Sequence, residues 1–181
     1  INMAEFMPKM MVEMFKDVTP EHVVQFLRNA IKNREAFQDL AQKIAEANIM
    51  KDMMFTSYKS KLSFEETVTK LRENATQAGW IIPDTRDVTD LWKKDGVEGV
   101  DFRVTTLYFC NPEGGYSIVK DEKLRPMVTL MPMGVSVYET SEGVEIGAMN
   151  LGLMSGFFSG NVKEVFKNAG ERIDKSLEGI I

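Results

Sequence analysis

The chain has 181 residues, of which 44% are hydrophobic and 27% charged, and its formal net charge is −5. This length allows one domain with a sizeable core plus a helical appendage, and the composition is typical of a globular protein. Basic and acidic residues are interspersed, with no basic stripe and no motif of a nucleic-acid reader, so we exclude nucleic acid as a partner.

The N-terminal stretch "MPKMMVEMF" is rich in methionine. Its members recur at offsets of three, four and seven residues, as Met7, Met10, Met11 and Met14. This spacing is typical of a core-facing helix, and it would also align thioethers for Cu(I). Because Phe6, Val12 and Phe15 are interleaved with the methionines, we favour packing over metal binding.

Two further helices are expected in the first fifty residues. Thr19 followed by Pro20 is a helix start signal, and Asn33 is a candidate cap for the next helix. Both segments carry an apolar stripe that needs a partner. We therefore expect a helical arm at residues 1–51 and a separate domain at 52–181.

From Met53 onward the pattern alternates between strands and helices. The "SFEE" capping box at Ser63 and Glu66, followed by Gly79, predicts a helix over 64–78. We expect strands at 53–62, 80–83, 101–110, 127–140 and 143–150, a short helix at 87–96, and a last helix capped by Asn161 that ends near Leu177. The order predicts an α+β fold with an antiparallel sheet of four or five strands.

The segment "NPEGG" after the 101–110 strand contains Gly114 and Gly115. Each glycine costs a helix about 1 kcal/mol. The segment lacks the residues of a P-loop and the spacing of a dinucleotide fingerprint. We therefore expect a turn here.

The segments "FRVTTLYFCNP", "DEKLRPMVTLMPMGVSVYE" and "GVEIGAMN" resemble a bacterial and archaeal family catalogued as domain of unknown function 302. The resemblance covers about two-thirds of the chain, from Met53 to Leu177. It implies a β-α-β4-α sandwich, often dimeric, and it suggests that a methionine-rich arm belongs to the functional unit. Many members carry a second cysteine where this chain has Met133, and a helix after Asn-Pro where this chain has paired glycines.

Cys110 is the only cysteine, and it lies at the end of a strand just before Asn111 and Pro112. Strand ends often carry functional side chains, whereas a free cysteine is also a common buried hydrophobe. Because many members of the family carry a cysteine at the position of Met133, the resemblance suggests that Cys110 and Met133 belong to one site. A thiolate and a thioether suit a thiophilic ion such as Cu(I), or haem as axial ligands, although the sequence demands neither cofactor. Directly opposed residues on adjacent strands can share a ligand, but a one-residue slip would place the sulfurs on opposite faces.

Three functions remain open from the sequence. The first is a non-enzymatic binding or assembly module with a pocket near Cys110 and Met133, including Asn111 and Pro112. The second is a thiol-dependent enzyme or sulfur carrier that uses Cys110, which requires an activated thiol. The third is an oligomerisation unit without a ligand. The single histidine, His22, is expected to be a solvated residue in the first turn of its helix, and it excludes His-cluster mechanisms.

The apolar stripes of the arm exceed what a small sandwich covers, so we expect a homo-oligomer whose interface includes residues before Lys51. No apolar run is long enough to cross a membrane. A lone cysteine fits a reducing compartment, so we expect a cytoplasmic protein. An exported form stays open because the sequence begins at Ile1 and not at an initiator methionine.

Overall fold

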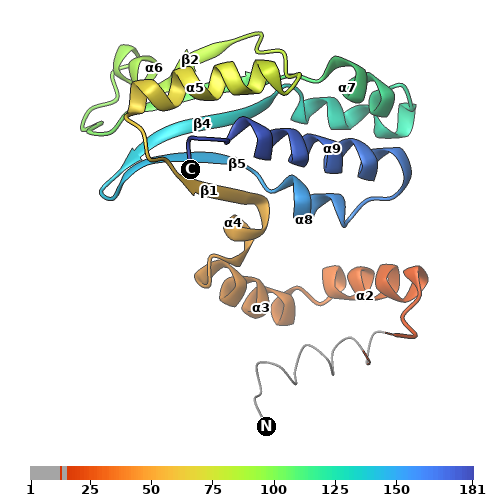
Figure 1. Ribbon diagram of the computed structural model, residues 1–181. Coiled ribbons are helices and arrows are strands. Elements are labelled where there is room, and N and C mark those ends of the chain that lie inside the picture. The colour runs from red at the N-terminus through yellow and green to blue at the C-terminus, as the bar shows by residue number, and fades with distance from the viewer. Residues whose placement is uncertain (1–12, 14–15) are drawn as a thin grey trace. The chain divides into compact units, whose positions relative to one another are not determined.

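The computed structural model describes residue 13 and residues 16–181, apart from several side chains between positions 31 and 49. The methionine stripe of the arm therefore lies outside the described residues. The chain divides into two compact units between Ile49 and Met50 (Figure 1). Each unit is described by itself.

The first unit contains α2 (Pro20–Lys32) and α3 (Arg34–Glu46). Thr19 caps α2 as expected, because its hydroxyl accepts a hydrogen bond from the His22 N–H. His22 completes a capping box, since its Nδ1 accepts from the Thr19 N–H at 3.3 Å. The histidine is thus an exposed capping residue of the first turn. On the same helix Phe26 and Leu27 are exposed by 65% and 49%, which leaves an apolar face without cover among the described residues.

The second unit is an antiparallel five-stranded sheet with helices, which confirms the predicted α+β class. The strand order is β1-β5-β4-β3-β2. In chain order the elements are α4 (Ile49–Met54, which crosses the division), β1 (Phe55–Lys59), α5 (Phe64–Gln77), β2 (Thr85–Asp87), α6 (Val88–Lys94), β3 (Val104–Phe109), α7 (Pro112–Val119), the 3-10 helix η1 (Glu122–Leu130), β4 (Met133–Thr140), β5 (Gly143–Met149), α8 (Leu151–Ser155) and α9 (Gly160–Ser176).

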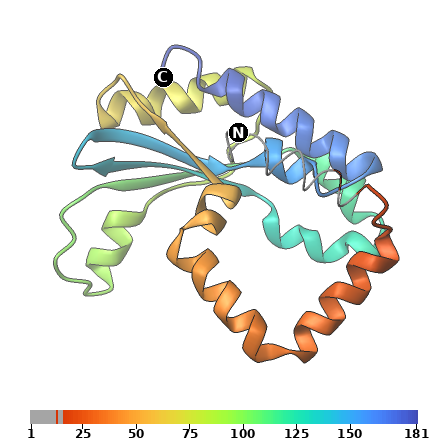
Figure 2. The ribbon, with the colours of Figure 1, turned by 90° about the horizontal axis from the view of Figure 1, so that it is seen from below.

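Helices α5 and α9 lie side by side against one face of the sheet (Figures 1 and 2). Their apolar stripes and the inward residues of the central strands form the core, because alternate residues of a strand share a face. Leu107 of β3 pairs with Val135 of β4, and both are fully buried beneath the helices. The core also contains Leu71, Val137, Ile146, Phe166 and Ile173. No helix in the described part of the chain has the length and apolarity to cross a bilayer.

Helix α5 matches the prediction closely. Ser63 caps it and forms a capping box with Glu66, and Gly79 follows its end at φ +90°, a left-handed value that favours glycine. The long helix at the C-terminal end also forms, but it starts at Gly160 with Ser159 as its N-cap. Asn161 is not the cap. Its side-chain amide instead donates to the Ser117 carbonyl and hydroxyl oxygens of α7.

Three further local predictions were wrong. The "NPEGG" segment begins the helix α7, and residues 127–130 belong to η1, outside the sheet, because β4 starts to pair with β3 only at Met133. In "WIIP" only Ile81 forms a bridge, to Cys110, and the edge strand β2 lies further on, at Thr85–Asp87. Strand propensity depends on available partners, which single segments do not reveal.

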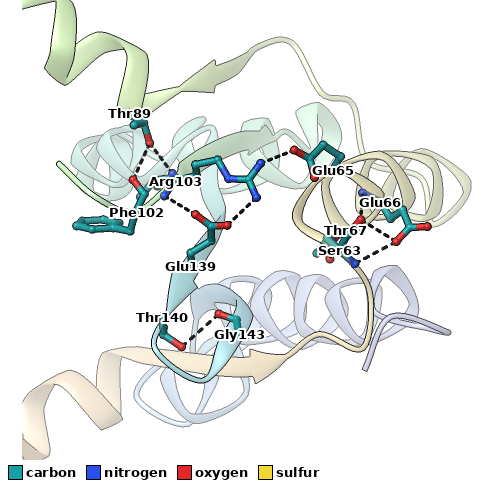
Figure 3. A network of polar contacts seen from close by, with 11 residues as sticks. Ser63, Glu65, Glu66, Thr67, Thr89, Phe102, Arg103, Glu139, Thr140 and Gly143 are labelled. Atoms are coloured by element: carbon teal, nitrogen blue, oxygen red, sulfur yellow. Dashed lines mark hydrogen bonds and ion pairs between the residues drawn. The ribbon is translucent and has the colours of Figure 1, made fainter.

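Arg103 connects the start of α5 to the sheet (Figure 3). Its Nη2 lies 2.6 Å from Glu139 Oε1, its backbone N–H donates to Glu139 Oε2 at 3.0 Å, and its Nη1 pairs with Glu65. The guanidinium also lies 4.5 Å from the centroid of the Phe64 ring. The hydrogen bond from the Arg103 side chain, assisted by the backbone bond, lowers the pKa of Glu139 below its ordinary 4.5.

We expect the Glu139→Gln variant to be less stable than wild type near neutral pH, because the glutamine loses the charge-assisted bonds to Arg103. The folded pKa of Glu139 is lower than the unfolded value of 4.5. The contribution of the carboxylate is therefore present above the unfolded pKa and is lost as pH falls through the folded pKa. Chemical denaturation near pH 7 and at progressively lower pH measures this, and the difference in free energy of unfolding between the two proteins should narrow as pH falls.

Glu142→Gln is the matched control. Glu142 pairs with Lys59, and both side chains are well exposed, so the free energy of unfolding should be unchanged. A gap for Glu139→Gln that stays equally large at the acidic pH would contradict the assignment.

Candidate ligand-binding cavity

An apolar cavity of about 290 Å³ lies where the ends of β3, β4 and β5 meet α7, η1 and α9. The core side of its wall is formed by buried apolar residues of β3, α8 and α9: Phe109, Leu151, Phe166 and Ala169. On the solvent side the wall includes Tyr116, Val128 and Leu130, which are exposed by 70%, 50% and 37%. The cavity therefore opens between α7 and η1 through an apolar rim.

All four residues that the sequence nominated line this cavity: Cys110, Asn111, Pro112 and Met133. Cys110 is half-buried, and its backbone exchanges hydrogen bonds of 2.8 and 2.9 Å with Ile81. Met133 is the first residue of β4 and packs against the core. The topology thus brings the two sulfur residues to one cavity from adjacent strand ends.

The register of β3 and β4 does not oppose the two sulfur residues directly. Met133 pairs with Phe109, one residue before Cys110. Paired residues share a face of the sheet and successive residues alternate, so the regular pattern places Phe109 and Met133 on the helix-covered face. Cys110 lies just beyond the last regular pair. Cys110 is therefore offset by one residue from the position opposite Met133, and the two residues are not directly opposed.

Asn111 and Pro112 start the helix that borders the cavity. The side-chain oxygen of Asn111 accepts from the Gly114 N–H at 3.2 Å, and Pro112 occupies the first turn, where its missing N–H costs nothing. The glycines of α7 allow close packing. A Cβ on Gly115 would lie 3.0 Å from the Met131 Sδ. A Cβ on Gly114 would lie 2.5 Å from the Asn111 Nδ2 and 3.1 Å from a methyl carbon of Val165. This tight contact with η1 and α9 offsets the helix cost of the glycines and explains why the turn prediction was wrong.

Two further methionines line the cavity, Met131 and Met149. Sequence reasoning missed both, although Met131 stands two residues from Met133 in "MPM" and offered a signal. Thioether side chains are flexible and polarizable, so they adapt to ligands of irregular shape. With Cys110 and Met133, four sulfur-containing residues line the cavity.

Trp80 forms another part of the wall and is only 5% exposed. Its ring packs on that of Phe109, with centroids 5.4 Å apart and planes tilted by 51°. Its backbone N–H donates to the Ala75 carbonyl at the end of α5, which fixes the position of the residue. Among the described residues, the indole Nε1 is the buried side-chain nitrogen that has no hydrogen-bond acceptor. No pattern in the sequence predicted this unpaired donor.

The wall carries no Lys, Arg, His, Asp or Glu side chain among the described residues. Likewise, the described part of the chain contains no group of three or more His, Cys, Asp or Glu side chains that could hold a metal ion. The two tyrosines whose pKa is raised do not line this cavity. Burial raises the pKa of Tyr138, whose hydroxyl is 2.7 Å from the Ser57 hydroxyl and also donates to Glu145. Burial and, next, the charge of Asp174 raise the pKa of Tyr58. The cavity is thus suited to uncharged, apolar contact.

Comparison with known proteins addresses the fold of the second unit. The crystal structure of an uncharacterized conserved protein DUF302 from Bacillus stearothermophilus is similar, with a TM-score of 0.58 and 19% sequence identity. The match covers 68% of this chain and 95% of that chain. At this identity the likeness shows the fold alone. No curated protein matches the chain.

The sequence profile described as "Domain of unknown function DUF302" matches residues 56–180, which span β1 to the C-terminal end of the second unit. The chain therefore belongs to the DUF302 family.

Proposed function

We propose that the chain is a non-enzymatic binding module that holds a small uncharged ligand in the cavity beside Cys110 and Met133. The observation that carries this proposal is the apolar cavity of about 290 Å³ between α7, η1 and α9. Ligand pockets of proteins have volumes of about 300–1,000 Å³ and mainly hydrophobic linings with few polar groups. The cavity matches the lower end of that range, so it favours a molecule of two or three rings over a tetrapyrrole such as haem.

A thiophilic ion is a second candidate ligand, because Cys110, Met131, Met133 and Met149 all line the cavity. Thiolate and thioether sulfur select Cu(I) over harder metals. The sulfurs lie on flexible side chains at the ends of three strands or connections, so binding would require them to converge on the ion. This candidate shares its site with the first and differs from it in chemistry.

A thiol-dependent enzyme or sulfur carrier has weaker support. A reactive cysteine needs a cationic or basic neighbour that stabilises the thiolate. The described cavity wall supplies no Lys, Arg or His side chain beside Cys110. We therefore place this alternative after the binding module.

We further propose that the module assembles as a homo-oligomer through its arm. Helix α2 exposes a row of apolar side chains: Val23, Val24, Phe26 and Leu27. Exposed apolar patches of this kind are typical of interaction sites. A second copy of the same helix is the simplest partner that would cover these apolar side chains.

Binding of the neutral fluorescent probe N-phenyl-1-naphthylamine tests the cavity. We expect the Val165→Phe variant to weaken probe binding at least about tenfold, because Val165 lines the cavity and a larger side chain fills the space of the ligand. The matched control is Val97→Phe, at an exposed loop position, which should bind the probe like wild type. Circular dichroism checks that both variants fold. Equal affinity in all three proteins, or no binding by wild type, would contradict the cavity as the site.

Titration with Cu(I) and with haem under anaerobic conditions tests the soft-ligand candidate. If the sulfurs bind Cu(I), wild type should take up one equivalent, Cys110→Ser should lose it, and Met133→Leu should bind more weakly. Absorbance and metal analysis report the uptake. Equal and negligible uptake by all three proteins would end this candidate. Loss in Cys110→Ser alone would leave Met133 as a packing residue.

Light scattering of an arm variant tests the assembly. We expect Phe26→Asp to lower the oligomer mass to that of the monomer, because it places a charge in the centre of the apolar face. Gln25→Asp, at a neighbouring exposed polar position, is the control and should keep the wild-type mass. An oligomer unchanged by Phe26→Asp, or a monomeric wild type, would refute the role of α2.

A further inference from the structure

We propose that β1 is a second contact of the homo-oligomer, at which two copies of the chain pair their β1 strands antiparallel about Ser57 and join their sheets. This inference rests on the proposed self-assembly and adds to it an interface formed by the second unit. Its basis is a strand edge that is complementary to itself, beside a row of charges on α9 that is also complementary to itself.

The backbone of β1 has one side bonded to β5 and one side open. β1 forms one end of the sheet. The Met54 carbonyl just before β1 accepts from the residue after β5, and the Ser60 N–H just after β1 donates to β5, each at 2.8 Å. Backbone groups of successive residues in an antiparallel strand point to alternate sides. Three residues therefore direct their N–H and C=O groups away from β5, where no strand of the described chain pairs with them: Phe55, Ser57 and Lys59.

The opposite end of the sheet is less suited to pairing. Strand β2 has only three residues, and two of them, Arg86 and Asp87, are charged and exposed. Charged side chains on a short strand are a common protection against edge-to-edge pairing. The longer strand β1 is therefore the edge that can accept another strand.

A two-fold axis at Ser57 gives β1 a favourable set of cross-strand pairs. Ser57 then lies opposite its own copy, where two small side chains meet. Thr56 lies opposite Tyr58 of the partner subunit, which is a pair of a β-branched and an aromatic residue, and Phe55 lies opposite Lys59 of the partner subunit. A register centred on Lys59 would oppose two like charges, and one centred on Phe55 would extend past the start of β1.

Helix α9 carries three charged side chains beside this edge. Lys167, Glu171 and Asp174 line one open cleft together with Thr56 and Tyr58 of β1. All three charged residues are exposed. None of them forms an ion pair with another residue in the described part of the chain. Their charges are therefore available to a partner that approaches along β1.

Helix α9 runs in the same direction as β1. Near its middle, a Cβ on Gly170 would lie 3.8 Å from the Cβ of Leu151. Leu151 follows the end of β5, which pairs with the start of β1. Beyond α9, the Ile180 carbonyl accepts from the Lys61 N–H, just past the end of β1, at 2.8 Å. The row of charges on α9 therefore extends along β1.

The two-fold axis at Ser57 consequently sets the two α9 helices antiparallel on the same face of the joined sheet. Lys167 of each copy then lies toward Asp174 of the partner subunit, so opposite charges meet twice. Glu171 is one turn from Lys167 and also stays close to a lysine. Pairing of two five-residue strands is marginal alone. The β1 contact therefore acts together with the α2 contact, because two weak contacts within one assembly reinforce each other.

Reversal of single charges tests the contact between the α9 helices. We expect Lys167→Glu or Asp174→Lys to raise the dissociation constant of the full-length oligomer about tenfold, because each opposes like charges at two symmetric positions. The double variant Lys167→Glu/Asp174→Lys restores opposite charges, so its dissociation constant should return to within about twofold of the wild-type value. Analytical ultracentrifugation over a dilution series measures these constants.

Lys70→Glu is the matched control. Lys70 is exposed on α5, which packs over β3 and β4, so the same change of charge should leave the dissociation constant unchanged. Single reversals without effect, or a double variant that assembles no better than either single variant, would overturn the β1 contact and leave the arm contact intact. A monomeric wild type would overturn both contacts.

Hydrogen exchange of backbone amides in the wild-type oligomer tests the strand pairing without any substitution. The N–H groups of Thr56 and Tyr58 point toward β5 by the same alternation and serve as the internal standard of slow exchange. We expect the amides of Phe55, Ser57 and Lys59 to exchange as slowly as this standard. Fast exchange of these three amides in the oligomer would contradict the pairing of β1 with its copy.

Discussion

β3 and β4 pair with Phe109 opposite Met133 and Leu107 opposite Val135. This register decides which side chains lie beneath α5 and α9, because a shift by one residue would turn every inward side chain outward. It also sets where the regular pairing stops. After Phe109 the chain leaves β3 and enters α7, and it returns to the sheet from η1 at Met133. The cavity occupies the space that these departing segments enclose with α9.

The walls of the cavity depend on close packing between segments that are distant in sequence. A Cβ on Gly115 would lie 3.0 Å from the Met131 Sδ, and one on Gly114 would lie 2.5 Å from the Asn111 Nδ2 and 3.1 Å from a methyl carbon of Val165. A side chain at either glycine would require these neighbouring side chains to shift. The sulfur residues, Trp80 and Phe109 then line an apolar space whose solvent side includes exposed apolar residues of α7 and η1. The proposed binding function depends on this space.

Features encoded by neighbouring residues were predictable from the sequence. The capping box at Ser63 and Glu66 and the stop at Gly79 define α5 without any tertiary information. The strand before Cys110 was found from its β-branched and aromatic residues, and its end nominated Cys110 as a candidate residue, which lines the cavity. The family resemblance was likewise carried by short contiguous motifs, and it is confirmed over residues 56–180.

Features that arise from tertiary contacts were not predictable in this way. Helix α7 contains two glycines that oppose a helix locally, and their close contacts with Asn111, Val165 and Met131 account for glycine at these positions. Residues 127–130 have strand-like composition, yet no strand is available to pair with them before Met133. The unpaired nitrogen of Trp80 depends on everything that surrounds the ring, so no local pattern could reveal it.

The proposed function requires that a ligand can occupy the space between α7, η1 and α9. The most direct test is a crystal structure of the full chain under xenon pressure, because xenon enters apolar cavities. We expect xenon density in contact with Phe109, Met133 and Trp80, which line the cavity. A side-chain arrangement that fills this space, with xenon absent from it or bound elsewhere, would contradict the claim.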